Sequence, residues 1–196
     1  TDLANTLKRI QKKGLAGFYE GKTADLIVKE MAFSKGIISH EDLKNYRAKY
    51  RTPLEFDYRG HHIISFSPPS SGGILIAQMM QMIQPYDVQK MGANSPAAVS
   101  LMAEAQRRAY ADRAEHMGDP DFYKVPTKTL ISNEYAQQRM KDYQVGVAGQ
   151  SKNIQAGKAY ESEQTTHFSV IDAKGNMVVI TTTLNDTYGN KTIVAG

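Results

Sequence analysis

The residues best suited to do chemistry lie in one short stretch, Gln164–Val170, with the sequence QTTHFSV. Two adjacent hydroxyls, those of Thr165 and Thr166, precede His167 at the start of an alternating pattern typical of a β-strand. A threonine hydroxyl becomes an effective nucleophile when a base removes its proton as it attacks. Thr-Thr pairs are also common in strands, because β-branched side chains fit a pleated sheet. The stretch therefore has a catalytic and a purely structural interpretation.

The base for such a threonine can be its own α-amine. Cutting the Gln164–Thr165 peptide bond would give Thr165 a free amine with a pKa of about 8, whereas an amide nitrogen has no useful basicity. Residues 146–159 are rich in Gly, Ser, Lys and Gln, which predicts a mobile loop before this bond. The cut ends can then separate while the strand holds Thr165. Since the amine already supplies a base, we assign His167 a structural or processing role.

The strand of Thr165 must be positioned by a second strand. Asp172–Asn176 fits a three-residue hairpin loop, in which a type I turn is followed by Gly175 in the left-handed conformation. This loop sets Thr165 opposite Thr183, whereas a two-residue or four-residue loop would set it opposite Leu184. The predicted register also pairs His167 with Thr181 and Ser169 with Val179.

One end of this hairpin therefore carries a polar face. Thr183 is expected to hydrogen-bond the Thr165 hydroxyl and to hold its rotamer. Asn185, two residues further on and on the same face, is expected to offer an amide to a polar substrate. Together, Thr165, Thr183 and Asn185 form the candidate catalytic and substrate-binding set.

The sequence upstream of this hairpin is mainly helical. Apolar spacing and capping residues predict helices over about 1–13, from about 23, after Ser39, over 74–83, from Ser95 to about 117 and from Ser132 through 143. Residues 53–66 alternate like two strands that turn at Arg59 and Gly60. The residues that could do chemistry are thus preceded by a long helix-rich region.

Further expectations concern the longest helix and the loop before helix 74–83. One side of the long helix mixes apolar and polar residues, namely Val99, Met102, Ala103, Gln106, Tyr110 and Arg113. Asp112, Arg113, Asp119 and Asp121 are expected to form an ion-paired network at its end, without chemistry. Ser70–Gly73 can cradle an anion at a helix start, but a tight loop required for packing is the preferred interpretation.

Composition excludes several classes of protein. A net charge of +4, without a basic stripe interleaved with aromatics, gives little support to nucleic-acid binding. No run of apolar residues is long enough for a membrane span, and the first residues read as an amphipathic helix rather than a signal peptide. The absence of cysteine excludes disulfides and thiol catalysis. No two histidines have the spacing of a helical zinc motif, so we expect no metal site.

Several motifs resemble those of a known family. The stretch TTHFSVIDAKGNMVVITTTLNDTYG closely resembles the start of the small subunit of γ-glutamyltranspeptidases, also called glutathione hydrolases. The resemblance extends upstream, in family order, through RTPLEFDYRG, PPSSGG, MAEAQRRAYADRAEHMGDPDF and YESEQTTH, and so covers nearly the whole chain.

This resemblance implies an α+β fold that is part of the αββα sandwich of N-terminal-nucleophile hydrolases, with a helix-rich first 145 residues and then a β-hairpin. Residues 1–164 would be the C-terminal part of a large subunit, including a mobile loop at about 146–160. Residues 165–196 would be the N-terminal hairpin of a small subunit. The remaining parts of both subunits would be its partners.

The implied activity is transfer of a γ-glutamyl group from glutathione or related amides to water or an amino acid, through a threonine acyl-enzyme. A zymogen would first cleave itself at Gln164–Thr165. Thr165 matches the family nucleophile, Thr183 a threonine that contacts it, and Asn185 a residue that binds the donor's α-amino acid end. The family needs no metal or organic cofactor. Its members usually work in the periplasm or outside the cell, although this chain carries no signal segment.

Other family site residues have no counterpart in these 196 residues. They are the arginine that binds the donor carboxylate, the acidic residue for the donor amine, a serine pair and the oxyanion-hole glycines. We therefore expect the isolated chain to show little or no turnover, and to self-associate through uncovered sheet edges and apolar faces. The alternatives are a related amide hydrolase, similar to a cephalosporin acylase, and a noncatalytic fragment or binding module.

Overall fold

The computed structural model describes residues 1–154, 165–183, 189 and 191–194. The chain divides into two compact units, one of Thr1–Lys49 with Glu161–Gly196 and one of Tyr50–Tyr160. Each unit is described by itself below. None of the helices in the described ranges is long and apolar enough to cross a bilayer.

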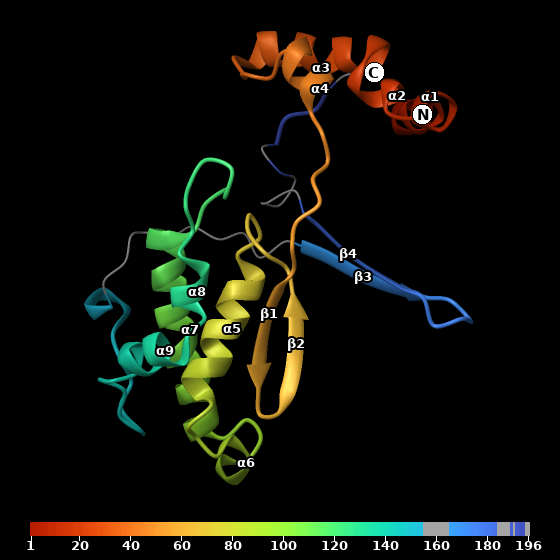
Figure 1. Cartoon of the computed structure of the whole chain (residues 1–196). Helices are drawn as coiled ribbons and strands as arrows, with labels where there is room; N and C mark the ends of the chain where they lie inside the picture. Colours follow the sequence, from red (N-terminus) through yellow and green to blue (C-terminus); the bar gives the residue numbers. More distant parts are fainter. Residues whose placement is uncertain (155–164, 184–188, 190, 195–196) are drawn as a thin grey trace. The chain divides into compact units, whose positions relative to one another are not determined.

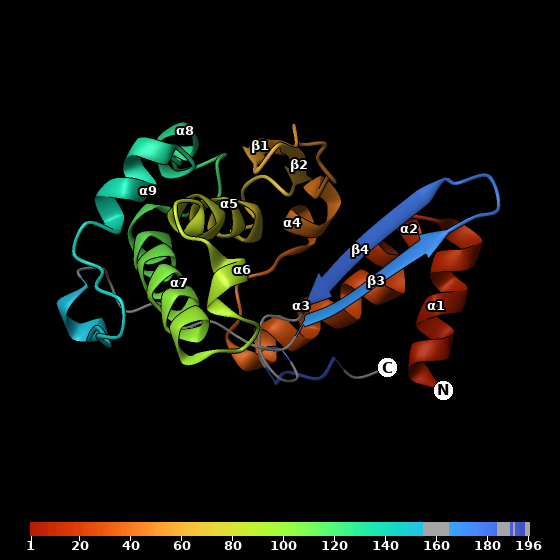
Figure 2. The ribbon, with the colours of Figure 1, turned by 90° about the horizontal axis from the view of Figure 1, so that it is seen from below.

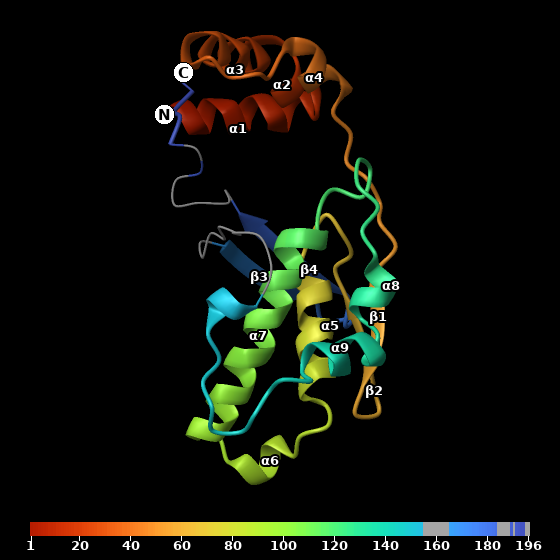
Figure 3. The same ribbon diagram turned by 90° about the vertical axis from the view of Figure 1, so that its left-hand side faces the viewer.

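Four helices form the first part of unit 1, and Figure 3 shows them together. Gly14, with φ of 58°, ends α1 as predicted, and Ser39 caps α4 in a capping box with Asp42. The short α2 was not predicted, because four residues are too few to show a helical period. It packs closely on α1, since a Cβ at Gly17 would overlap the carbonyl oxygen of Arg9. The bounds are α1 (Asp2–Lys13), α2 (Ala16–Tyr19), α3 (Gly21–Ser34) and α4 (His40–Asn45).

Unit 2 is built around α5 (Gly72–Ile83), which lies between the β1–β2 hairpin and α7 in Figures 1 and 3. Leu54 and Phe56 of β1 and Leu130 pack with Ile74 and Ala77 of α5 in one core cluster. A second cluster joins Met82 to α7 and α9 through Leu101, Ala105, Ala136 and Met140. The other elements are β1 (Leu54–Tyr58), β2 (His61–Ser65), α6 (Val88–Met91), α7 (Pro96–His116), α8 (Thr127–Leu130), α9 (Asn133–Arg139) and a 3-10 turn (Ser151–Asn153).

The start of α5 explains the Ser70–Gly73 loop. A Cβ at Gly73 would overlap the carbonyl oxygen of Phe66, whereas a Cβ at Gly72 would meet only Ser70 Oγ, at 3.7 Å. Gly73 is therefore needed for close packing of the α5 backbone on the end of the second strand. This contact supports the packing interpretation of the loop.

The buried side of α7 differs from the mixed side described from the sequence. Its buried residues are Ala98, Leu101, Glu104, Ala105, Arg108, Ala109 and Asp112, whereas Val99 and Met102 are 54% and 57% exposed. Three charged side chains lie on the core side because they find partners there. Glu104 pairs with Arg108 at 2.6 Å, and Asp112 pairs with Arg139 of α9 at 3.1 Å.

Two other expectations concern the segments that follow α7. Ser132 caps α9 as predicted, but this helix ends at Arg139, short of residue 143. The acidic residues beyond α7 pair with a basic residue that the sequence did not suggest: Arg51 donates two hydrogen bonds to the Asp121 carboxylate, at 2.7 and 2.8 Å. Asp119 lies 3.9 Å from the same guanidinium.

The second part of unit 1 is an antiparallel ribbon of β3 (Thr165–Ile171) and β4 (Met177–Thr183), which Figure 2 shows side by side. Its register agrees with the prediction, with Thr165 opposite Thr183 and Ile171 opposite Met177. The described chain is thus α+β, with two hairpins and a predominance of helix.

Candidate active site

The turn between β3 and β4 fixes the register of the candidate site. Gly175 has a φ of 83° and donates its N–H to the Asp172 carbonyl at 3.0 Å, while the Asp172 N–H donates to the Asn176 carbonyl, also at 3.0 Å. The left-handed conformation at position 175 is one that glycine adopts without steric cost. The predicted turn, with its glycine bulge, is therefore confirmed.

The Asp172 side chain reinforces this turn. Its Oδ1 accepts hydrogen bonds from the backbone N–H groups of Lys174 at 2.8 Å and Asn176 at 2.9 Å, and its Oδ2 accepts one from Asn176 Nδ2 at 2.7 Å. The bonds from Asn176 are the main reason that the pKa of Asp172 lies below its ordinary value. Backbone and side-chain hydrogen bonds thus both stabilise the turn, which favours a single register of the two strands.

Seven residue pairs follow from that register, and their faces alternate along the ribbon. Thr165, His167 and Ser169 pair with Thr183, Thr181 and Val179, as predicted. The pairs between them in the middle of the ribbon are apolar, with Phe168 opposite Ile180 and Val170 opposite Val178. The structure therefore brings Thr165 and Thr183 together as direct cross-strand partners at the open end of the ribbon.

Two members of the predicted set lie outside the described residues, namely Gln164 before the proposed cleavage point and Asn185 after β4. Their predicted roles stay predictions. Of the predicted loop at 146–160, residues 146–154 are described, and they include the 3-10 turn at Ser151–Asn153.

Sequence reasoning missed the polar cluster in the core of unit 2. Asp112 accepts a hydrogen bond from Gln78 Nε2 of α5 at 2.9 Å, and burial raises the pKa of its carboxyl. Burial, followed by the nearby Asp112 charge, raises the pKa of Tyr135 to about 12. The sequence signal for these buried charges was the i, i+4 spacing of opposite charges at Glu104, Arg108 and Asp112. These contacts join α5, α7 and α9, so we assign them to packing.

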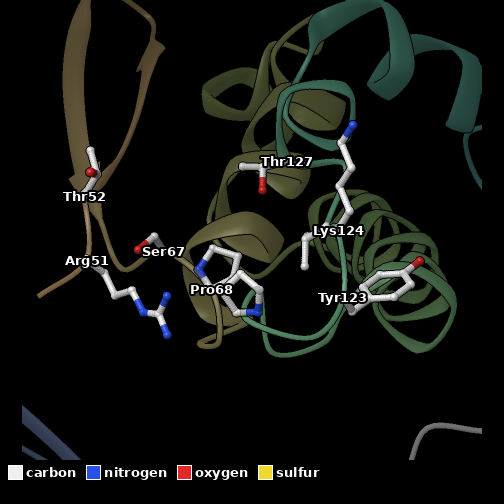
Figure 4. Close-up of a pocket in the computed structure, with 9 residues that line it drawn as sticks. Arg51, Thr52, Ser67, Pro68, Tyr123, Lys124 and Thr127 are labelled. Atoms are coloured by element: carbon white, nitrogen blue, oxygen red, sulfur yellow. The ribbon is translucent and has the colours of Figure 1, made fainter. Parts of the chain in front are cut away.

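A cavity of about 320 Å³ opens on unit 2 between the segment before β1 and the segment joining α7 to α8. Figure 4 shows the hydroxyl-bearing Ser67 and Thr127 around it, with Arg51 and Lys124 approaching from different segments. Its lining residues are Arg51, Thr52, Ser67, Pro68, Pro120, Tyr123, Lys124, Val125 and Thr127. None of these belongs to the predicted catalytic set. Within the part of the chain that the structure describes, no cluster of His, Cys, Asp and Glu could hold a metal ion.

The fold and the hairpin define an α+β protein in which Thr165 pairs with Thr183 at the open end of the β3–β4 ribbon. The family model described as gamma-glutamyltranspeptidase matches residues 1–196. The chain therefore belongs to the gamma-glutamyltranspeptidase family.

Individual relatives agree with this assignment. The chain is 46% identical to the glutathione hydrolase proenzyme of Escherichia coli, over all of this chain and 34% of that protein. It is 42% identical to the Acylase ACY 1 proenzyme of a Pseudomonas species, over 96% of this chain and 34% of that protein. It also resembles the structure of Helicobacter pylori gamma-glutamyltranspeptidase, with a TM-score of 0.73 and 41% identity, over 83% of this chain and 47% of that one. The chain thus spans about a third of the length of these curated relatives.

Proposed function

We propose that this chain is part of a γ-glutamyltransferase and glutathione hydrolase that is made as a proenzyme and cleaves itself between Gln164 and Thr165. Residues 1–164 would then end the large subunit, and residues 165–196 would begin the small subunit. The observation that carries this proposal is the pairing of Thr165 with Thr183 at the open end of β3–β4, in a chain that belongs to the gamma-glutamyltranspeptidase family.

Self-cleavage would begin with attack of the Thr165 hydroxyl oxygen on the carbonyl carbon of Gln164. The carbon–nitrogen bond breaks as the new ester bond forms, and the proton lost by the hydroxyl ends on the released nitrogen. Water then hydrolyses the ester, which leaves a carboxyl group on Gln164 and restores the Thr165 hydroxyl. The product carries the free α-amine that the later reaction requires.

In the transfer reaction, the Thr165 hydroxyl would attack the γ-carbonyl carbon of a donor such as glutathione. The α-amine takes the hydroxyl proton and passes it to the departing amine, which leaves the γ-glutamyl group as an ester on Thr165. Water or the amine of an amino acid then attacks this ester, and its proton returns to the Thr165 oxygen. Thr183 would hold the hydroxyl in position, and Asn185 would bind the α-amino acid end of the donor.

The rest of both subunits would complete the donor site, and resemblance to the family supports a location in the periplasm or outside the cell. No metal or organic cofactor takes part in the proposed steps. Each proton transfer uses groups of Thr165 itself, the substrates or water.

The test uses the full-length precursor and two substitutions on neighbouring positions. Thr165→Ala should abolish both the appearance of two fragments and the release of product from a γ-glutamyl anilide. Thr166→Ala is the matched control, since strand alternation places position 166 on the opposite face, and it should retain both. A Thr165→Ala precursor that still matured and turned over the anilide would exclude the proposed nucleophile.

A second candidate function is hydrolysis of another amide by the same nucleophile. It is favoured by the 42% identity to a protein named Acylase ACY 1 proenzyme. Such an enzyme would keep Thr165 and its self-cleavage while differing in the pocket for the acyl group. Comparing the mature enzyme on γ-glutamyl anilide and on a cephalosporin amide would separate the two activities.

A further inference from the structure

An exposed segment joins α4 to β1. Residues 46–53 lie outside helices and strands, and all of them are exposed. The boundary between the two compact units falls within this segment of the sequence, between Lys49 and Tyr50. Exposed segments at such boundaries are preferred sites of proteolysis, because the backbone can enter a protease without the unfolding of a core.

Tyr50 is the most accessible aromatic residue of this segment. Its side chain is fully exposed, whereas the Tyr46 ring stacks on Tyr19 with ring centroids 5.4 Å apart. No hydrogen bond joins the Tyr50 backbone to the part of the chain that the structure describes. The Tyr46 N–H, in contrast, donates to the carbonyl oxygens of Asp42 and Leu43, at 3.0 and 3.3 Å. The ring and the backbone of Tyr50 are therefore both accessible to an incoming protein.

Two other exposed aromatic residues differ from Tyr50 in their backbone. Phe33 lies in α3, whose backbone is hydrogen-bonded, and the Phe122 N–H donates to the Asp119 carbonyl oxygen at 3.0 Å. A protease must first open such structure, and its rate then falls with the population of the opened form. An exposed ring and a backbone without such bonds coincide at Tyr50.

The residue after Tyr50 adds only a weak restraint. Arg51 donates two side-chain hydrogen bonds to Asp121, at 2.7 and 2.8 Å, but its backbone makes no hydrogen bond to the described residues. Exposed ion pairs contribute little to stability, so release of Arg51 should slow a reaction at this bond by less than about fivefold.

We propose that the Tyr50–Arg51 peptide bond is a processing site for a protease that accepts a large aromatic side chain before the scissile bond. The apolar slot of such a protease would take the Tyr50 ring. Water would add across the peptide bond and leave a carboxyl group on Tyr50 and an amine on Arg51. This cut differs from the proposed self-cleavage, because it uses an external enzyme and does not require Thr165.

The test exposes the full-length protein, under native conditions, to a low concentration of chymotrypsin. Intact mass and N-terminal sequencing follow the fragments with time. We expect an early product that begins at Arg51. Cleavage after Tyr46 should be at least about tenfold slower, because its ring contact and its hydrogen bonds must be released first.

Tyr50→Thr tests the role of the ring. Position 50 is fully exposed, so the substitution should leave the fold unchanged by circular dichroism. It should slow cleavage at this bond by more than about tenfold, because the protease slot loses the aromatic side chain. Tyr46→Thr is the matched control in the same segment, and it should leave cleavage at the Tyr50–Arg51 bond within about twofold of wild type.

Three results would each overturn the inference: no product that begins at Arg51, equal cleavage after Tyr46 and Tyr50, or an unchanged rate in Tyr50→Thr. The proposed function is tested separately, because Thr165→Ala precursor should be cut at Tyr50 as fast as wild type. Loss of self-cleavage in that variant bears on the nucleophile alone, and loss of the chymotrypsin product bears on the processing site alone.

Discussion

Thr165 lies directly opposite Thr183 in the antiparallel ladder of β3 and β4, seven positions from the turn that sets this pairing. The pairing depends on backbone geometry at Gly175, whose φ is 83°. A change of one residue in the turn would move every side chain of one strand to the other face. The pairing of Thr165 with Thr183 therefore depends on the turn at the opposite end of the β3–β4 ribbon.

We predict that Gly175→Val weakens the ribbon by about 1–2 kcal/mol, because a β-branched residue opposes the left-handed conformation. Gly175→Asn should do less harm, since asparagine tolerates that conformation. The measurement is the rate of self-cleavage of the full-length precursor. The wild type should be fastest, Gly175→Asn slower and Gly175→Val slowest. Lys174→Ala is the neighbouring control, and equal rates for it and for Gly175→Val would contradict the dependence on the turn.

Adjacent glycines at the start of α5 should respond differently to alanine. Gly73→Ala should lower the free energy of unfolding by about 1–3 kcal/mol, because the new Cβ overlaps the Phe66 carbonyl and forces the backbone to shift. Gly72→Ala should change it by less than about 0.5 kcal/mol, since only Ser70 Oγ lies nearby. Urea unfolding of the two variants checks this, and similar losses for both would argue against the packing role of Gly73.

The two neighbours Leu101 and Met102 test which side of α7 faces the core. Leu101 is fully buried, so Leu101→Ala should cost about 2–5 kcal/mol of stability. Met102 is 57% exposed, and Met102→Ala should stay within about 0.5 kcal/mol of wild type. Thermal or denaturant unfolding gives the comparison, and the reverse ranking would mean that α7 is rotated about its axis.

Stability at high pH should depend on Tyr135. Burial and the Asp112 carboxylate raise its pKa to about 12 in the folded state, above the ordinary value of 10.0. Between these values the unfolded chain loses this proton while the folded chain keeps it, so the phenol favours unfolding increasingly as pH rises from 10 to 12. Tyr135→Phe should flatten this part of the stability–pH curve.

Near-ultraviolet titration of the tyrosines gives a direct check on that pKa. The wild-type protein should show a tyrosine that ionises late, and Tyr135→Phe should remove that late step. Tyr50, which is fully exposed, is the control position, and Tyr50→Phe should leave the late step unchanged. An identical titration after Tyr135→Phe would refute the assignment.

The parts of the fold that were predicted from the sequence are those set by local rules. The β3–β4 register follows from the turn length and Gly175, and the start of α7 follows from the Ser95 cap and Pro96. Gly14 ends α1 for a similarly local reason. In each case a few adjacent residues determine the backbone, so no knowledge of the tertiary structure is needed.

The parts that were wrong or missed depend on distant partners. The core side of α7 carries Glu104, Arg108 and Asp112, which polarity assigns to solvent until their partners on other segments are known. Arg51 meets Asp121 across seventy positions of sequence, and Gly149 meets Glu104 across forty-five. Within the candidate site, the Thr165–Thr183 pairing was predictable because it is local to one hairpin, whereas the position of Asn185 lies outside the described residues.

The charges on the buried side of α7 also determine how far along its axis this helix can sit. Glu104, Arg108 and Asp112 repeat one helical turn apart with alternating sign. Sliding α7 by a single turn would place Arg108 where Asp112 now meets Arg139, so an attraction would become a repulsion between two guanidinium groups. An all-apolar stripe would tolerate such a slip. Here the alternating charges favour one position of α7 along its axis.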